Sequence, residues 1–197
     1  MSFTPHVPGP DTDAADTTAR RPLVVVSVGT DHHPFDRLVS AMDTWAAANP
    51  EVDVVIQRGT AEATSHAPSH DLIPHNELCR LFGSALAVVV HGGPSTIMDA
   101  RAAGRVPIVL PRNPDFGEHV DDHQLRFGRH LQTHSLARLA GDVDEVGSLL
   151  IEALVDPDDF CVDVDGGVSP GIVAFGRVVD DLLGITTPVV PSRKDQP

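Results

Sequence analysis

The chain has 197 residues, of which 28 are acidic and 14 basic, and its formal charge is −14 at pH 7. This length suits one domain of about 100–200 residues, and the charge would repel nucleic-acid backbones and anionic lipid headgroups. No window approaches the roughly 20 consecutive apolar residues that a membrane-spanning helix needs. Cys79 and Cys161 lack CxxC spacing, and no signal-like apolar run follows Met1, so we expect a cytoplasmic protein.

Both ends of the chain are polar and lack apolar periodicity. Residues 1–21 predict a disordered tail and residues 188–197 a flexible one, which leaves residues 22–187 as a single folded domain. With 41% hydrophobic residues, 4% aromatic residues and no Tyr, its core must be built from Val, Leu, Ile and Ala.

Short aliphatic runs alternate with helical patterns along this domain. We expect strands at residues 23–28, 52–57, 86–90 and 107–110, with a short extended piece at 71–74. We expect helices at residues 34–49, 77–83, 94–103, 121–131, 143–154 and 173–183, the last two joined by a loose Asp/Gly-rich connection. This alternation predicts an α/β fold with a doubly wound, Rossmann-like parallel sheet.

The segment HGGPST, residues 91–96, joins an aliphatic strand to a helix. Ligands of open parallel sheets bind at such junctions, outside the carboxyl ends of the strands. Gly92 and Gly93 let backbone approach a ligand closely, and the helix start with the Ser95 and Thr96 hydroxyls offers hydrogen-bond donors to a phosphate. The alternative is an ordinary turn followed by a helix that starts at Pro.

Asp99 lies one turn further along this helix, on the same face as Ser95 and Thr96. Its carboxylate can accept hydrogen bonds from the hydroxyls of a ribose. The chain contains neither G-x-G-x-x-G after a strand nor G-x-x-x-x-G-K-[ST]. Readings as a dinucleotide oxidoreductase or a P-loop ATPase are therefore excluded.

Five motifs occur in the order found in the C-terminal, donor-binding half of the GT-B glycosyltransferase family 28. They are VSVGT at 26–30, PFDRL at 34–38, HGGPST at 91–96, GRVPI at 104–108 and GEHVDDHQ at 117–124. The resemblance covers residues 23–154 and extends to Alg13-like small subunits of two-component enzymes in that family. It implies that the domain is the C-terminal half of a GT-B fold and binds a UDP-sugar, while a membrane-associated partner subunit holds a lipid-linked acceptor.

The resemblance also implies a role for individual residues in substrate binding. Gly29 and Thr30 match the loop that faces the diphosphate and the partner, and Ile73 matches the segment that reads the uracil edge. The diphosphate element corresponds to His91, Gly92, Gly93, Ser95 and Thr96, the ribose acid to Asp99, and the sugar-facing helix start to Glu118, His119, Asp122 and Gln124. The general base is expected on the partner, with His32 and His119 as candidates to contribute, and no cofactor is implied.

Other interpretations of the same residues remain open. His119 and His123 with Asp122 have spacing that permits a metal site, although the expectation is that no metal is bound. A Ser/His hydrolase using Ser95 and His91 lacks the G-x-S-x-G pattern. A stand-alone nucleotide-sugar-binding module without catalysis is the main alternative to an enzyme, and a UDP-sugar epimerase is a weaker one.

Overall fold

The computed structural model of the chain describes residues 21–162. Within them, six parallel strands form one sheet in the order β3-β2-β1-β4-β5-β6. Their bounds are β1 Leu23–Ser27, β2 Asp53–Gln57, β3 Ser69–His70, β4 Ala87–Val90, β5 Ile108–Val109 and β6 Arg138–Leu139. The order reverses beside β1, which places β4 next to it, as in doubly wound folds.

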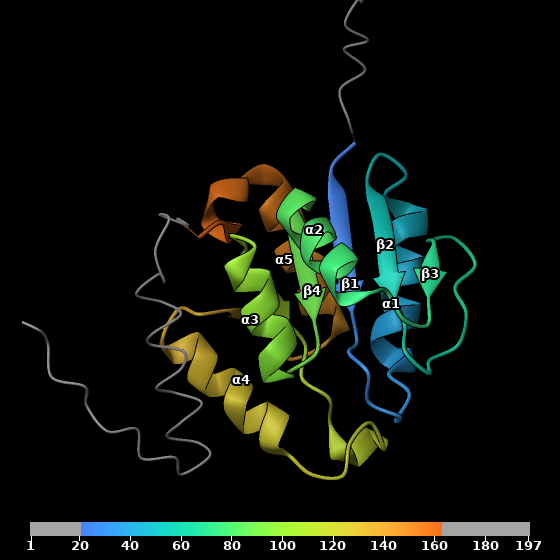
Figure 1. Cartoon of the computed structure of the whole chain (residues 1–197), viewed down its shortest axis with the longest axis vertical. Helices are drawn as coiled ribbons and strands as arrows, with labels where there is room; N and C mark the ends of the chain where they lie inside the picture. The colour runs from blue at the N-terminus through green and yellow to red at the C-terminus, as the bar shows by residue number, and fades with distance from the viewer. Residues whose placement is uncertain (1–20, 163–197) are drawn as a thin grey trace, which may run out of the picture.

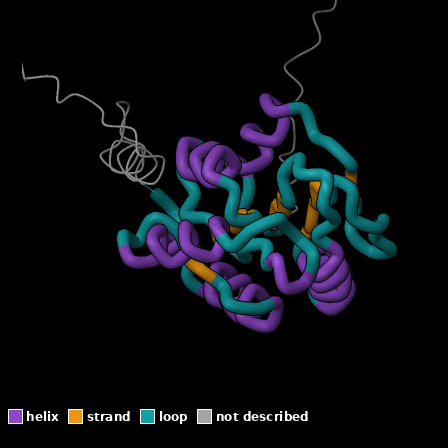
Figure 2. The backbone as a smooth tube through the Cα atoms, turned by 90° about the horizontal axis from the view of Figure 1, so that it is seen from below, coloured by secondary structure: helices purple, strands orange, loops and turns teal. Residues whose placement is uncertain are grey.

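Helices cover both faces of this sheet, as Figures 1 and 2 show. One face packs against α1 (Asp36–Ala48) and α5 (Val143–Val155). The other face packs against α2 (His75–Ser84), α3 (Pro94–Ala102) and α4 (His123–Thr133). Two short 3₁₀ helices, η1 (Pro114–Phe116) and η2 (Pro157–Phe160), lie in the connections before α4 and after α5.

Alternating side chains of the central strands divide between the two cores. On β1, Val24 and Val26 enter the core under α1 and α5, whereas Val25 enters the core under α2, α3 and α4. Val88 and Val89 of β4 divide in the same way. A strand buried on both faces must be apolar at every position, which explains the continuous Val-rich runs.

The predicted α/β doubly wound architecture is confirmed. The extended piece expected at 71–74 is wrong in position, because the edge strand β3 lies at Ser69–His70 and its chain then leaves the sheet. Strand β6 was not predicted, because its two residues are too few to show a period. The helix expected at 173–183 and both predicted tails lie outside the described residues, except for Arg21, and the domain boundaries stay predictions.

Candidate functional site

A pocket of about 880 Å³ opens at the carboxyl ends of β1, β2 and β4. This volume lies within the range of roughly 300–1,000 Å³ that is usual for ligand sites. Its wall comes from five separate segments, namely the loop after β1, the end of β2, the chain entering α2, the β4–α3 junction and the start of α4. The lining residues are Gly29, Thr30, Asp31, His32, Gln57, Leu72, Ile73, Pro74, His75, Leu78, His91, Ser95, Thr96, Asp99 and Gln124.

The structure therefore brings together most of the residues predicted from the sequence. Gly29, Thr30, Ile73, His91, Ser95, Thr96, Asp99 and Gln124 all line this one pocket, although they span almost 100 positions of the chain. Parallel strands direct all of their carboxyl ends to the same edge, so each following loop arrives at the same place.

The imidazole of His91 fills the space between Gly29 and Gly93. A Cβ on Gly93 would lie 2.1 Å from His91 Nε2, and a Cβ on Gly29 would lie 2.4 Å from His91 Cε1. Gly29 also has a φ of +76°, in the left-handed region that glycine tolerates without strain. These two glycines therefore make room for a histidine, in addition to any role in ligand approach.

His91 is a neutral side chain at the floor of the pocket. It is 8% exposed, and burial, with the nearby charge of Arg112, lowers the pKa of His91 from 6.5 to about 4. Its Nδ1 is buried and has no hydrogen-bond partner within the described part of the chain. A neutral imidazole offers one donor and one acceptor, so His91 can still serve a ligand.

The N-terminus of α3 points its first turn toward the same pocket. Gly93 is the N-cap residue in an extended conformation, and Pro94 begins the helix where its missing N–H costs nothing. Ser95 is exposed, Thr96 is buried, and both line the pocket. This end of the helix thus carries partial positive charge and unsatisfied donors beside neutral His91, a setting suited to a phosphate.

Gln57, which the sequence analysis missed, connects two walls of the pocket. Its Nε2 donates to Ser27 Oγ at 3.2 Å and to the Gly29 carbonyl at 3.3 Å, while its Oε1 accepts from Ile73 N at 3.0 Å. A polar residue that ends a buried aliphatic strand was the available signal. Gln57 fixes the segment around Ile73 relative to the loop after β1.

Gln124 performs a similar role on the opposite wall. Its Oε1 accepts from Gly92 N at 3.1 Å and from Arg112 N at 3.2 Å. A Cβ on Gly92 would lie 2.8 Å from the Cβ of Gln124, so a glycine is required for this close approach. Of the four predicted residues of the sugar-facing run, only Gln124 lies in α4 and lines the pocket.

The other members of that run lie before the first helical residue, because α4 begins at His123 and not at 121 as predicted. The prediction that Glu118 faces the sugar is wrong. Its buried carboxylate pairs with Arg37, at 2.8 Å to Nε and 2.9 Å to Nη2, and does not line the pocket. The carboxylate of Asp122 forms an exposed pair with Arg126 at 3.1 Å and does not line the pocket.

Arg112 is a fully buried guanidinium that connects the loops of this edge. Its Nη1 donates to the carbonyls of His33 (2.7 Å) and Glu118 (3.1 Å), and its Nη2 donates to the carbonyl of Val28 (2.9 Å). Burial lowers the pKa of Arg112, yet the side chain stays charged because its ordinary pKa is so high. No sequence motif indicated this residue.

A group of His and Asp residues lies at the rim. Hydrogen bonds from His33 and the charge of Arg112 outweigh the effect of burial and lower the pKa of Asp31 to about 2. His119 Nε2 lies 3.6 Å from Asp31, and its Nδ1 lies 3.6 Å from Asp121. Burial and the charge of His123 lower the pKa of His119.

Two further predicted residues, His32 and His119, lie at the rim of the pocket. His32 is exposed and lines the mouth, while His119 lies beside the mouth and outside the lining. The spacing of His119, Asp122 and His123 permitted a metal site, but the carboxylate that lies near both rings belongs to Asp121 and not to Asp122. The expectation that no metal is bound there stays a prediction.

Two solved glycosyltransferases are similar to this chain in structure. The glycotransferase of kitacinnamycin has a TM-score of 0.57 and 17% identity, with 94% of this chain and 49% of that one covered. CalG4, the calicheamicin glycosyltransferase, has a TM-score of 0.54 and 16% identity, with 86% and 44% covered. The likeness concerns the fold, and the chain spans about half the length of either protein.

No curated protein matches the chain. Between residues 21 and 162, no helix has the length and apolar character of a membrane span.

A family model identifies the family of the chain. The family model "Glycosyltransferase family 28 C-terminal domain" matches residues 23–139, which is more than half of the 197. The chain therefore belongs to the glycosyltransferase family 28 C-terminal domain family, with the fold of the C-terminal half of a GT-B glycosyltransferase.

Proposed function

We propose that this chain is the donor-binding subunit of a two-component glycosyltransferase that transfers a sugar from a UDP-sugar to a lipid-linked acceptor. The observation that carries the proposal is the single pocket in which the start of α3, neutral His91 and Asp99 meet. The partial positive charge of the helix start suits a diphosphate, and the Asp99 carboxylate in the same pocket suits the hydroxyls of a ribose.

The diphosphate would lie against the N-terminus of α3 and the loop formed by Gly29 and Thr30. As the bond to the sugar breaks, negative charge develops on the UDP leaving group, and the helix dipole with the Ser95 and Thr96 donors would stabilise it. Neutral His91 adds a donor without adding a charge that must be desolvated. No metal is required by this arrangement.

The two ends of the donor would lie on opposite sides of this helix start. Asp99 would accept the ribose hydroxyls, and the segment around Ile73, fixed by Gln57, would receive the uracil. Gln124, with His119 beyond it, would border the sugar. Glu118 and Asp122 are left out of this arrangement, because their carboxylates pair with Arg37 and Arg126.

The acceptor side would be completed by a membrane-associated partner subunit. The pocket is open at its rim, and the chain is about half as long as the glycosyltransferases it resembles. We place the general base on that partner, with His32 and His119 at the rim as candidates to contribute. The chain itself would stay in the cytoplasm and reach the inner membrane face only through the partner.

Calorimetric titration of the full chain with UDP tests donor binding. Asp99→Ala removes a charged acceptor, a loss of about 1.5–3 kcal/mol or roughly 10–150-fold in Kd, provided that Asp99 holds the ribose. Asp53→Ala is the matched control, because Asp53 is exposed at the other end of β2 and forms only a 3.7 Å pair with Arg21. Indifference of the unmodified chain to every uridine nucleotide would remove the proposal.

Co-expression with membrane-associated candidate subunits tests the split enzyme. We expect sugar transfer to a lipid-linked acceptor only when both subunits are present. Full activity of the lone chain on a soluble acceptor would contradict the two-component proposal. Binding of UDP-sugar without turnover in the presence of every such subunit would favour a stand-alone binding module.

A further inference from the structure

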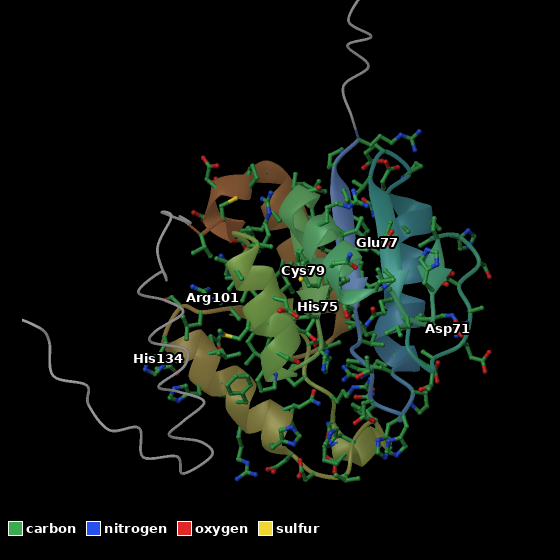
Figure 3. The ribbon with its side chains drawn as sticks, in the orientation of Figure 1. Asp71, His75, Glu77, Cys79, Arg101 and His134 are labelled. Carbon is green, nitrogen blue, oxygen red and sulfur yellow. The ribbon has the colours of Figure 1, made fainter. Side chains whose placement is uncertain are left out.

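Three potential metal ligands face one another where α2 passes α3. His75 and Cys79 are one helical turn apart on α2, as Figure 3 shows, and Asp99 reaches them from α3. His75 Nδ1 lies 3.5 Å from Asp99 Oδ2, and Cys79 Sγ lies 3.9 Å from His75 Nδ1. One atom of each residue lies within 4.8 Å of the other two.

These distances are close to those between neighbouring ligands of a tetrahedral ion. Zinc binds sulfur at about 2.3 Å and nitrogen or oxygen at about 2.0–2.1 Å, so tetrahedral angles separate the ligand atoms by roughly 3.3–3.6 Å. The His75–Asp99 and His75–Cys79 pairs need to close by only a few tenths of an ångström, whereas Cys79 and Asp99 are known to lie within 4.8 Å of each other. Their side chains can move, since that of His75 is 73% exposed.

The side chains of His75, Cys79 and Asp99 are less closely hydrogen-bonded to one another than the His and Asp side chains at the rim are. There, Asp31 accepts from His33 Nδ1 at 2.6 Å and from His33 N at 2.8 Å, a local turn that uses up its oxygen. Between His75 and Asp99 the 3.5 Å separation exceeds the roughly 2.7–2.9 Å of a charge-assisted hydrogen bond. The group around Cys79 thus has unused ligand capacity.

The order Cys79, His75 and Asp99 also resembles a nucleophilic triad. Burial and the negative charge of Asp99, however, raise the pKa of the Cys79 thiol. Activated cysteines have a lowered pKa, so this environment argues against a nucleophile.

We propose that His75, Cys79 and Asp99 form a site for a thiophilic divalent ion such as Zn²⁺, whose occupancy blocks the donor pocket. Binding replaces the thiol proton, which passes to solvent, with the metal–sulfur bond. Thiolate, imidazole and carboxylate together favour Zn²⁺ over Mg²⁺ or Ca²⁺, and three protein ligands leave one position open. The ion would block donor binding and take no part in sugar transfer, so the proposal that transfer needs no metal is unaffected.

The blocking effect follows from the position of the ligands and rests on the proposed function. His75 and Asp99 both line the donor pocket, and Asp99 is the carboxylate assigned to the ribose. One carboxylate oxygen held by an ion cannot at the same time accept the ribose hydroxyls with full strength. Metal and nucleotide therefore compete for Asp99.

Titration of the full, tag-free chain with Co²⁺ tests the site without any nucleotide. We expect one equivalent to produce the intense sulfur-to-cobalt charge-transfer absorption of a tetrahedral thiolate site, which Zn²⁺ then displaces. Cys79→Ser should abolish this band. Cys161→Ser should retain it, because Cys161 is the other of the two cysteines and contacts Arg105, outside the group of His75, Cys79 and Asp99. Absence of the band, or its survival in Cys79→Ser, would overturn the proposal.

Competition is then measured with UDP in the presence of saturating Zn²⁺. We expect at least a tenfold weaker apparent affinity for UDP in the unmodified chain and no such change in Cys79→Ser, which controls for chelation of the metal by UDP itself. If the cobalt band appears but UDP affinity is equal in both, the blocking part of the proposal is wrong. If UDP binds neither chain while the band is present, the proposed function fails and the metal site stands.

Discussion

Substitution of Gly93 by Ala tests the close contact between residue 93 and the imidazole of His91 at the floor of the pocket. The backbone at Gly93 has φ −79° and ψ 126°, which alanine adopts without strain. The added Cβ, however, would lie 2.1 Å from His91 Nε2 and 2.7 Å from His91 Cε1, where about 3.5–4.0 Å is normal. Because Gly29 confines the ring from its other side, we expect overpacking to lower the free energy of unfolding by about 1–3 kcal/mol.

Urea denaturation followed by circular dichroism measures this loss. Gly147→Ala is the matched control, because its Cβ would lie 3.7 Å from Trp45 in ordinary contact, and removal of a helical glycine should add about 0.4–1 kcal/mol. In a His91→Ala background the ring is gone, so Gly93→Ala should cost less than about 0.5 kcal/mol. An equal cost in both backgrounds would show that the clash with His91 is not the cause.

Two further predictions concern charge at the same edge. Arg37→Ala removes the charged partner of the Glu118 carboxylate, whose side chain is 5% exposed and which then keeps only the hydrogen bond from Asn113 N. We expect this to cost about 1–3 kcal/mol in chemical denaturation, whereas Arg126→Ala breaks an exposed pair worth about 0.3–0.5 kcal/mol. Equal losses would contradict the structural role of Glu118. The pKa of His91 falls from 6.5 in the unfolded chain to about 4 in the native state, so its contribution is complete above pH 6.5 and is lost as the pH falls toward 4. That loss amounts to roughly 3 kcal/mol of the free energy of unfolding. In His91→Gln the free energy of unfolding should fall less between pH 6.5 and 4. An unchanged fall would refute the assignment of this pH dependence to His91.

The sequence predicted the sheet well because its central strands are buried on both faces. Such strands must be continuously apolar, and their Val-rich runs are visible without any structure. The pocket followed from the same logic, since polar or glycine-rich residues after those strands are carried to one edge. Short edge strands such as β3 and β6, with two residues each, contain too few positions to show a period.

What the sequence could not reveal is which polar groups are already occupied. Glu118 matches a sugar-facing position by motif, yet Arg37, 81 positions away, holds its carboxylate. Gln57 and Arg112 belong to no motif, and most of their hydrogen bonds are to main-chain atoms of distant loops. A carbonyl acceptor leaves no trace in the identity of its residue, so contacts of this kind are invisible until the chain is folded.

Those same contacts hold together the loops that line the pocket. Arg112 joins the loop after β1 to the loop before α4, Gln57 joins the loop after β1 to Ile73, and Gln124 joins α4 to Gly92. Each crosslink is internal to the protein, so the loops are ordered before a nucleotide arrives. Because the ordering of loops is a main cost of binding, a pocket held in this way can use its few donors for affinity. We therefore expect the buried guanidinium of Arg112, which lies outside the pocket lining, to support ligand binding by fixing the loops that do line the pocket.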